Sequence, residues 1–258
     1  MLQLLFTLLL SFFLMGMVWL AFKMNHRAEM LNLSRPVVIF ILGFTHLAFL
    51  GWDNLSISVF YMLLFWAIYH IIFELRHRYS LKCVDTRFTI LSADWKDKNE
   101  GFIQFFCWQA VYMWVLTLPF YFIGKRDMAA ISDVVLMIFI FVRMIGTVAA
   151  GMTLQKYKER GGKEVCTDGF WGLSRHPNYF FEWLTWVGFS LMAYHDLLSI
   201  LAIMSPIIML AYFFSFLIPL TEKYCEKSYG HLYKKYQAEI SMFFPKPKRR
   251  TNKKDKNQ

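Results

Sequence analysis

Three residues recur at every fourth position in a stretch that is otherwise suited to a membrane interior: Asn178, Glu182 and Trp186. This spacing places them on one face of a helix. Arg175 and His176 come directly before that helix, beside its free N–H groups and the positive end of its dipole. The combination favours an anionic ligand bound at the helix start and reaching down the polar face. Intramembrane Asn and Glu can also simply hydrogen-bond a neighbouring helix, but acidic groups in membrane helices are costly and usually functional.

A second polar face is expected in the segment 56–75. The residues that share it are Trp66, His70, Glu74 and His77. At about 1.5 Å per residue, Tyr69 and His70 lie roughly 10 Å inside the boundary near Arg76, and Glu182 lies equally deep. If the two helices are neighbours, their polar groups enclose one chamber. His70 and Glu74 could instead form a structural i,i+4 pair.

The composition indicates a polytopic membrane protein. Hydrophobic residues make up 57% of the 258 residues, and the mean hydropathy is +0.38. Such a chain is too apolar for a soluble protein. Seven stretches of about the length that crosses a bilayer are present: 2–22, 36–52, 56–75, 101–123, 130–150, 178–194 and 197–219. We therefore expect an all-α fold of seven transmembrane helices.

The cations in the loops predict the orientation. Of the 28 Lys and Arg residues, 25 fall in the segments 23–35, 76–98, 156–175 and 223–256. Because Lys and Arg concentrate on the cytoplasmic side, we expect the N-terminus outside and the C-terminus in the cytoplasm. The membrane would be the bacterial inner membrane or the endoplasmic reticulum. This bias and a basic tail on an anionic leaflet explain the net charge of +10, so no nucleic acid partner is expected.

The chain is expected to form one domain over residues 1–245. A polar stretch at 222–240 predicts an amphipathic helix on the membrane surface that could close a cytoplasmic cavity. Residues 246–258 are basic and are expected to be disordered. The cysteines follow no paired spacing, so we expect neither a disulfide framework nor a metal site. They are Cys83, Cys107, Cys166 and Cys225.

Further cations could contribute to a ligand site. Arg143 lies inside the fifth span, so it must snorkel toward a boundary or find a partner such as Glu182. The run that follows suits phosphate binding and contains Lys156, Lys158, Arg160 and Lys163. The charged loop 76–100 is either a solvated connector or a segment that folds Arg87 over cofactor phosphates.

A resemblance to a known family rests on the motif Ser174-Arg175-His176-Pro177-Asn178-Tyr179 followed by Glu182. Asp168-Gly169 precedes the motif, and Tyr233, Tyr236 and Pro245 follow it. Together they resemble the C-terminal domain of the steroid 5α-reductase (3-oxo-5α-steroid 4-dehydrogenase) family, in its bacterial uncharacterised branch. The similarity covers roughly residues 140–247, with 178–245 the most similar part, and extends to Val84-Asp85-Thr86-Arg87.

This resemblance implies a seven-helix membrane reductase. The enzyme would transfer hydride from NADPH to the carbon–carbon double bond of a lipid-like enone, above all a 3-oxo-Δ4 steroid, that enters from the bilayer. Asn178 and Glu182 match the pair that contacts the nicotinamide, and Tyr179 matches a position where an aromatic is usual. Looser matches to phosphate and adenosine ligands are Arg87, Lys156, Arg160 and Tyr229. The predicted cofactor site also includes Arg143, Arg175, His176 and Tyr233.

The resemblance also implies a tyrosine and a carboxyl group that polarise the substrate from the N-terminal half. Tyr69 is the candidate tyrosine, and Asp53 or Glu74 is the candidate carboxyl group, although Asp53 also fits a solvated loop. A hydrogen-bond donor in a dry cavity would stabilise the charge that collects on the substrate oxygen. The chain departs from the family at Phe181, where glycine is usual. A bulky side chain there could narrow the approach of the cofactor or merely face lipid.

Two other functions compete with the reductase. Isoprenylcysteine and phospholipid methyltransferases share a related Arg-His-Pro-x-Tyr helix start and bind S-adenosylmethionine. The cation-rich helix start favours an anionic dinucleotide over a sulfonium donor, and those methyltransferases lack an acid at the position of Glu182. A scaffold or transporter is the third possibility, but the chain shows no internal repeat. No Gly-x-Gly-x-x-Gly motif is present, so NADPH would bind without a Rossmann fold.

Overall fold

The computed structural model describes residues 2–25, 29–81, 98–126, 131–162 and 164–248, and within these ranges it contains helices and loops but no strand. The first helices are α1 (Leu2–Asn25), α2 (Glu29–Leu50), α3 (Asn54–Leu81), α5 (Lys98–Leu116), α6 (Leu118–Ile123) and α7 (Ile131–Glu159). A short turn η1 (Gly169–Gly172) leads into α8 (Pro177–Ala193). The last rod combines η2 (Leu198–Ile203), α9 (Met204–Tyr212), η3 (Phe213–Leu217) and α10 (Ile218–Tyr229), and α11 (His231–Glu239) follows it. The all-α fold is therefore confirmed for the described part of the chain.

In the described part of the chain, six helical segments are long and apolar enough to cross a membrane. They are Leu2–Met24, Asn32–Leu50, Asn54–Arg76, Glu100–Ile123, Ser132–Glu159 and Leu198–Tyr229. The protein is thus a multi-pass membrane protein. Helix α8 has 17 residues and coincides with the predicted span 178–194, but at about 1.5 Å per residue it is shorter than the hydrocarbon core.

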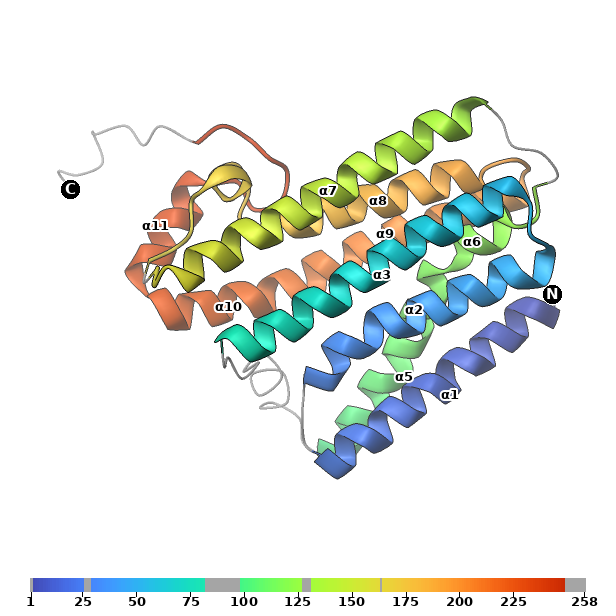
Figure 1. The fold of residues 1–258 in the computed structure, drawn as a ribbon. Coiled ribbons are helices and arrows are strands. Elements are labelled where there is room, and N and C mark those ends of the chain that lie inside the picture. The colour runs from blue at the N-terminus through green and yellow to red at the C-terminus, as the bar shows by residue number, and fades with distance from the viewer. Residues whose placement is uncertain (1, 26–28, 82–97, 127–130, 163, 249–258) are drawn as a thin grey trace.

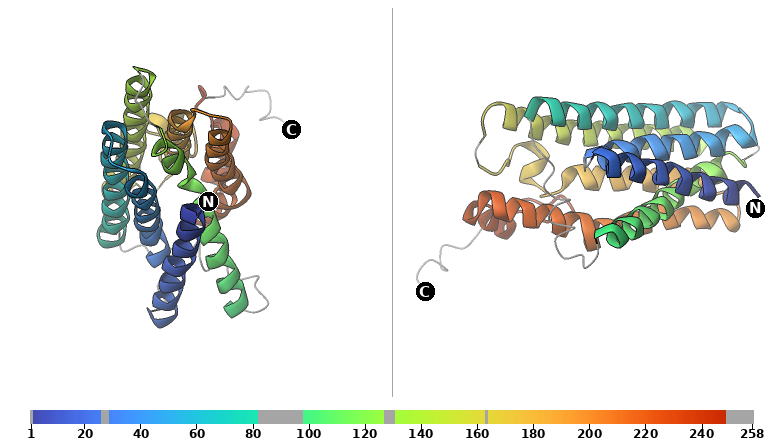
Figure 2. Two further views of the ribbon diagram at one scale, coloured as in Figure 1. Left: turned by 90° about the vertical axis from the view of Figure 1, so that its right-hand side faces the viewer. Right: turned by 90° about the horizontal axis from the view of Figure 1, so that it is seen from below.

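The helices form an elongated bundle (Figure 1). Helix α8 packs along α7 and against α9, and α3 also packs against α7. Helix α5 pairs with α1 and crosses the remaining helices obliquely (Figure 2). The start of α1 lies at the opposite end of the bundle from α11, which sits beside the start of α8 and the end of α7.

Glycines of α7 allow its two neighbours to approach closely. A Cβ at Gly146 would lie 2.7 Å from the Phe181 ring of α8, and a Cβ at Gly151 would lie 2.5 Å from the Tyr69 hydroxyl of α3. Small residues at such positions permit close helix packing in membranes. Phe181 therefore points into the α7–α8 contact, with its ring edge on Phe170, and it does not face lipid.

Replacing Gly146 with alanine is expected to destabilise the protein by about 1–3 kcal/mol, because the added methyl group overpacks the contact with Phe181. Thermal unfolding in detergent measures this effect. Adding the substitution Phe181→Leu to the Gly146→Ala variant should recover part of the lost stability. The control is Gly16→Ala, since a Cβ at Gly16 meets nothing within 4 Å. Equal stability of the two single variants would contradict the packing argument.

The predicted amphipathic helix at 222–240 is wrong in its boundaries. The last rod continues without interruption from the membrane segment into α10, which ends at Tyr229, and a separate helix α11 begins at His231. Gly230 lies between them with φ +53°, a conformation that glycine adopts without steric cost. The break turns α11 back toward the start of α8. A tight turn at His195-Asp196 joins α8 to η2, and in it Asp196 Oδ1 accepts the Ser199 N–H at 2.7 Å.

Candidate functional site

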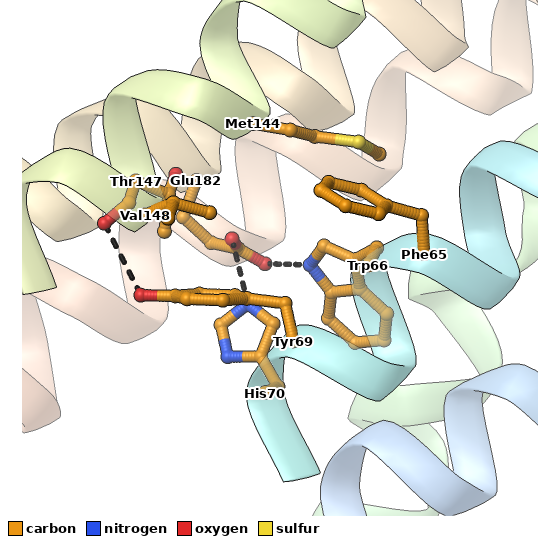
Figure 3. Close-up of a pocket in the computed structure, with 8 residues that line it drawn as sticks. All are labelled: Phe65, Trp66, Tyr69, His70, Met144, Thr147, Val148 and Glu182. Atoms are coloured by element: carbon orange, nitrogen blue, oxygen red, sulfur yellow. Dashed lines mark hydrogen bonds and ion pairs between the residues drawn. The ribbon is translucent and has the colours of Figure 1, made fainter. Parts of the chain in front are cut away.

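The carboxylate of Glu182 lies between α8 and α3 (Figure 3). The Trp66 indole N–H donates to Glu182 Oε1 at 2.7 Å, and His70 Nε2 lies 3.2 Å from Oε2. Glu182 is 9% exposed, and it lies roughly 8 Å beyond the first residue of its helix at about 1.5 Å per residue. The two polar faces therefore meet, which the sequence left open, and His70 pairs with Glu182 across the helices.

A small pocket surrounds this carboxylate. Its volume is only about 10 Å³, roughly the room that one water molecule needs, and its lining comes from α3, α7 and α8. The lining residues are Phe65, Trp66, Tyr69, His70, Met144, Thr147, Val148 and Glu182. The Tyr69 hydroxyl donates to the Thr147 carbonyl at 3.3 Å, so its proton is directed at α7 in this arrangement. The pocket is smaller than the roughly 300–1,000 Å³ usual for ligand sites.

Asn178 lies one turn before Glu182, at the second position of α8. Its Oδ1 atom is buried and has no hydrogen-bond partner in the described part of the chain. Buried polar atoms are normally hydrogen-bonded, so each exception needs an explanation such as an absent ligand. The N–H group of a ligand would satisfy this oxygen. The surroundings of Asn178 are therefore suited to a ligand that carries an amide group.

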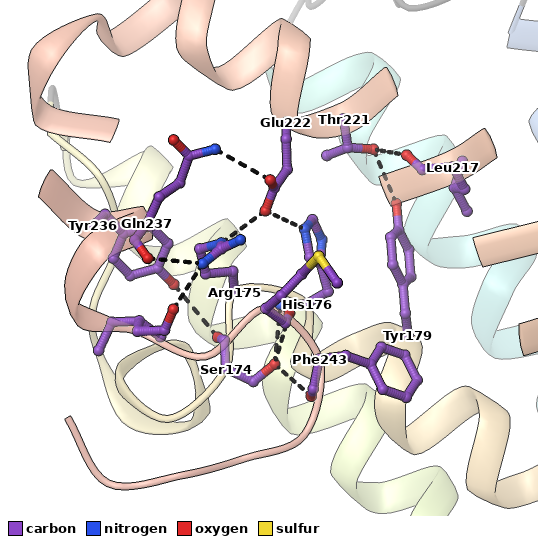
Figure 4. A network of polar contacts seen from close by, with 12 residues as sticks. Ser174, Arg175, His176, Tyr179, Leu217, Thr221, Glu222, Tyr236, Gln237 and Phe243 are labelled. Carbon is purple, nitrogen blue, oxygen red and sulfur yellow. Dashed lines mark hydrogen bonds and ion pairs between the residues drawn. The ribbon is translucent and has the colours of Figure 1, made fainter. Parts of the chain in front are cut away.

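The start of α8 is held by Glu222 of α10 (Figure 4). Arg175 Nε donates to Glu222 Oε1 at 2.7 Å, and His176 Nε2 lies 3.2 Å from the same oxygen. An ionised carboxylate only accepts hydrogen bonds, so His176 carries its proton on Nε2. Burial lowers the pKa of His176 below its ordinary value and outweighs the opposing effect of Glu222. His176 is therefore neutral at physiological pH.

The remaining donors of Arg175 fix the C-terminal segment. Its guanidinium donates to the carbonyls of Gln237 and Ile240 at 3.0 and 2.8 Å, and its backbone N–H donates to the Ser241 carbonyl at 2.8 Å. Glu222 also accepts from Gln237 Nε2 at 3.1 Å. The structure thus turns Arg175 and His176 toward Glu222 and α11. Their role as ligands of an anion stays a prediction, because an anion would first have to replace these contacts.

Tyr179 connects the start of α8 with the last rod. Its ring stacks on His176 at 5.3 Å and on Phe213 at 5.1 Å, measured between ring centroids. Its hydroxyl lies 3.4 Å from Thr221 Oγ1. Phe213 begins the π-helix η3, an irregularity that is frequent at functional sites. Tyr179 therefore packs between His176 and the last rod, and it is not among the residues that line the Glu182 pocket.

The other predicted cofactor ligands occupy three places. Arg143 does not pair with Glu182: its guanidinium carbon lies 4.9 Å from the Phe139 ring centroid, and its buried Nε has no hydrogen-bond partner in the described ranges. Lys156 and Arg160 are exposed near the end of α7. Tyr233 is buried in a separate apolar cluster with Tyr236 and Ile240, against which Tyr229 packs. Arg87 lies outside the described residues.

The structure places Asp53 far from the other catalytic candidates, at the start of α3. Its Oδ1 accepts the Ser56 N–H at 2.7 Å, so Asp53 caps the first turn of α3. At about 1.5 Å per residue this carboxylate lies roughly 24 Å from Tyr69 along α3. Glu74 lies one turn beyond His70, half-buried on α3, and is not part of the pocket lining.

Sequence reasoning did not assign two residues that the structure brings into the site. Trp66 supplies the shortest hydrogen bond to Glu182, and Glu222 holds both Arg175 and His176. Trp66 was recognisable as part of the polar face, because it precedes His70 by four residues. No spacing signal connects Glu222 with the start of α8, since 46 residues separate it from His176.

A comparison with family models finds one match, DUF1295, described as a protein of unknown function, which covers residues 15–240. No curated protein and no solved structure matches the chain.

Proposed function

The chain belongs to the DUF1295 family, and from this premise we propose that it is a membrane reductase that uses NADPH. Its substrate would be a lipid-like enone, with a 3-oxo-Δ4 steroid as the class that the resemblance to steroid 5α-reductases implies. The observation that carries the proposal is the pairing of Glu182 with Trp66 and His70 inside the bundle, one turn from the unpartnered Asn178 Oδ1.

The residues at this place suit the nicotinamide end of NADPH. A nicotinamide carries a carboxamide, whose N–H groups can donate to the free Asn178 Oδ1 and to the Glu182 carboxylate. The phosphates would be held at the same end of the bundle by Lys156 and Arg160, which are exposed. Arg175 would join them after leaving Glu222. When bound, the cofactor supplies the hydride of the reaction.

The chain's own residues would polarise the substrate and exclude water. Reduction of an enone places negative charge on the carbonyl oxygen, which a nearby O–H or N–H donor stabilises in a dry site. Tyr69 and His70 lie beside the carboxylate on α3, and the Tyr69 hydroxyl would leave the Thr147 carbonyl to serve this purpose. Trp66, Phe65 and Met144 supply the apolar walls.

The proposed topology has seven spans, with α8 as the sixth. It places the N-terminus outside and the C-terminus in the cytoplasm, in a bacterial inner membrane or the endoplasmic reticulum. The start of α1 and α11 lie at opposite ends of the bundle (Figure 1). This supports the proposed topology, because an odd number of spans places the two ends of the chain on opposite sides of the membrane. The concentration of Lys and Arg at the α11 end agrees with the positive-inside rule. Helix α8 is shorter than the hydrocarbon core, and the helices packed around it would cover the rest of the membrane thickness.

Ligand-induced stabilisation of the detergent-purified protein tests the proposal. NADPH at about a hundred times its dissociation constant is expected to stabilise the protein by about 2.7 kcal/mol. This corresponds to an increase in Tm of roughly 5–11 °C for a chain of this size. An enone added afterwards should consume the near-ultraviolet absorbance of reduced nicotinamide. Stabilisation by S-adenosylmethionine alone would replace the reductase with the methyltransferase, and stabilisation by neither would remove both.

A further inference from the structure

A second polar cluster, here called the Arg35 cluster, joins three helices of the bundle. Its members are Arg35 of α2, Gln109 and Tyr112 of α5, and Tyr212 of α9. Arg35 Nη2 donates to the Tyr212 hydroxyl at 2.7 Å, and Gln109 Nε2 donates to the same hydroxyl at 3.2 Å. The ring of Tyr112 packs on that of Tyr212 at 4.5 Å between centroids. None of these residues lines the Glu182 pocket, so the proposed reaction gives them no role.

The guanidinium of Arg35 is directed into the bundle and not toward the nearer end of its helix. Arg35 is the fourth residue of the segment Asn32–Leu50, which can span the membrane. An arginine so close to the end of a span usually extends toward the water. Here it reaches Tyr212, which lies near the middle of the spanning segment Leu198–Tyr229. A charge held at this depth is costly unless an opposite charge or water compensates it.

The described part of the chain compensates this charge only in part. No carboxylate of these residues lies within ion-pair distance of Arg35. The guanidinium carbon lies 5.5 Å from the centroid of the Tyr212 ring, and such a cation–π contact offsets a fraction of the cost. The hydrogen bond to Tyr212 goes to a neutral hydroxyl. The half-buried Arg35 therefore has room and reason for one anionic partner.

Gln109 adds an unpaired group at the same place. It is 1% exposed, and its Oε1 atom has no hydrogen-bond partner in the described ranges. The Tyr212 hydroxyl already accepts from two donors, so its own proton is left for another acceptor. If the amide of Gln109 is turned over, it accepts this proton, but its NH2 group then stays unpaired. In either orientation the cluster keeps unused hydrogen-bonding capacity, which an absent ligand would explain.

The backbone and the rings beside the cluster also point to a ligand. Tyr212 is the last residue of α9, and the π-helix η3 begins at the next residue, an irregularity that is frequent at functional sites. Phe216 stacks on Tyr212 at 5.3 Å, and Phe105 lies 5.9 Å from Phe216 between centroids. Both phenylalanines are half-buried and belong to segments that can span the membrane. This apolar wall suits the hydrocarbon part of an amphiphile whose polar end meets Arg35.

We propose that the Arg35 cluster binds the monoanionic oxygen group of a membrane-dissolved amphiphile, either a carboxylate or a phosphodiester. One negative charge balances the one cation of the cluster, whereas a doubly charged phosphate would leave a charge uncompensated. The oxygens of the group accept from the remaining N–H groups of Arg35 and from the Tyr212 hydroxyl. The amide of Gln109, turned over, supplies one more donor. This site is additional to the proposed cofactor site and does not depend on the reductase activity.

Thermal unfolding of the full-length protein in a neutral detergent tests this assignment. One probe is dodecanoate at about pH 8, where its carboxylate is ionised, and dodecanol is its uncharged counterpart. The other probe is phosphatidylglycerol, with zwitterionic phosphatidylcholine as its counterpart. At about a hundred times its dissociation constant, an anionic probe that binds should raise Tm by roughly 5–11 °C. Whichever anion raises Tm identifies the source of the group, and the uncharged and zwitterionic counterparts should have no comparable effect.

The most informative variant is Gln109→Glu, because it places a carboxylate beside Arg35 where the anion of the ligand would lie. Its Tm without probe should not decrease, and its probe-dependent increase should be lost. Arg35→Gln should weaken binding of the probe at least tenfold, whereas Arg35→Lys keeps the charge and should keep part of the affinity. The matched control is Gln104→Glu, which makes the same change at an exposed position of α5 and should leave the increase unchanged.

Four outcomes would overturn the inference: an equal increase in the Gln109→Glu and Gln104→Glu proteins, an equal effect of dodecanol, an equal effect of the soluble anion acetate, or no increase with either anionic probe. The last would leave Arg35 as a structural link between α2 and α9. Any NADPH-dependent increase in Tm should be the same in the Gln109→Glu protein, because the two sites share no residue. If NADPH has no effect while the probe pattern holds, the reductase falls and the anion site stands.

Discussion

Replacing Glu182 with glutamine is expected to weaken NADPH binding by roughly ten- to a hundredfold while the protein stays inserted in the membrane. A hydrogen bond to a charged group contributes about 1.5–3 kcal/mol, and about 1.4 kcal/mol corresponds to a factor of ten in affinity. The glutamine keeps the size of the side chain, so the change isolates the charge. Titration of the detergent-purified protein with NADPH measures the affinity.

The matched control for this prediction is Glu159→Gln. Glu159 is exposed near the end of α7 and bonds to Gln155, so its substitution should change neither affinity nor stability by more than about 0.5 kcal/mol. An unchanged affinity of the Glu182→Gln protein would exclude this carboxylate from the cofactor site. Equal losses in both variants would indicate a general effect of charge and not a specific contact.

Replacing Glu222 with glutamine is expected to destabilise the protein by about 3 kcal/mol. The change leaves the Arg175 guanidinium largely buried without its counter-ion, and breaking one partner of a buried pair costs about 3–5 kcal/mol. The lower value applies because the two side chains are 10% and 15% exposed. For a protein of this size the loss corresponds to a decrease in Tm of roughly 6–12 °C, which thermal unfolding in detergent measures.

Limited proteolysis separates a local from a global effect of this change. Lys234 and Lys235 are exposed on α11, so release of α11 from Arg175 should accelerate tryptic cleavage there before cleavage elsewhere. Glu226→Gln is the control, because Glu226 bonds to the same Gln237 at an exposed position.

The double variant Arg175→Met/Glu222→Met should lose less stability than the sum of the single changes. Strictly additive losses would show that the two residues do not interact.

The positions of the membrane helices could be predicted from the sequence, because the length of an apolar stretch is a property of neighbouring residues alone. The predicted span 56–75 lies within α3, and the predicted span 197–219 begins one residue before the rod that ends in α10 and otherwise lies within it. The predicted face of Asn178, Glu182 and Trp186 depends only on helical periodicity, and Glu182 and Trp186 both contact Trp66. The boundary at 222–240 failed because a continuous polar pattern does not reveal the left-handed backbone at Gly230.

The place of Asp53 in the fold was not readable from the sequence for a related reason. An acidic residue next to a membrane segment fits a catalytic group, a solvated loop and a helix cap equally well, and only the hydrogen bond from Ser56 decides among them. Phe181 posed the same difficulty, since its bulk was visible but its direction was not. Its partner Gly146 lies 35 residues earlier in the chain, on a helix whose orientation relative to α8 has no local signal.

By itself, the sequence determined the membrane class, the positions of the spanning helices and which residues share a face, because each follows from composition and from a fixed rise and rotation per residue. Only the tertiary structure decided that His70 and Trp66 hold Glu182 and that Glu222 holds Arg175 and His176. These contacts join residues that are far apart in the chain, and they depend on how the helices rotate and cross as their side chains pack.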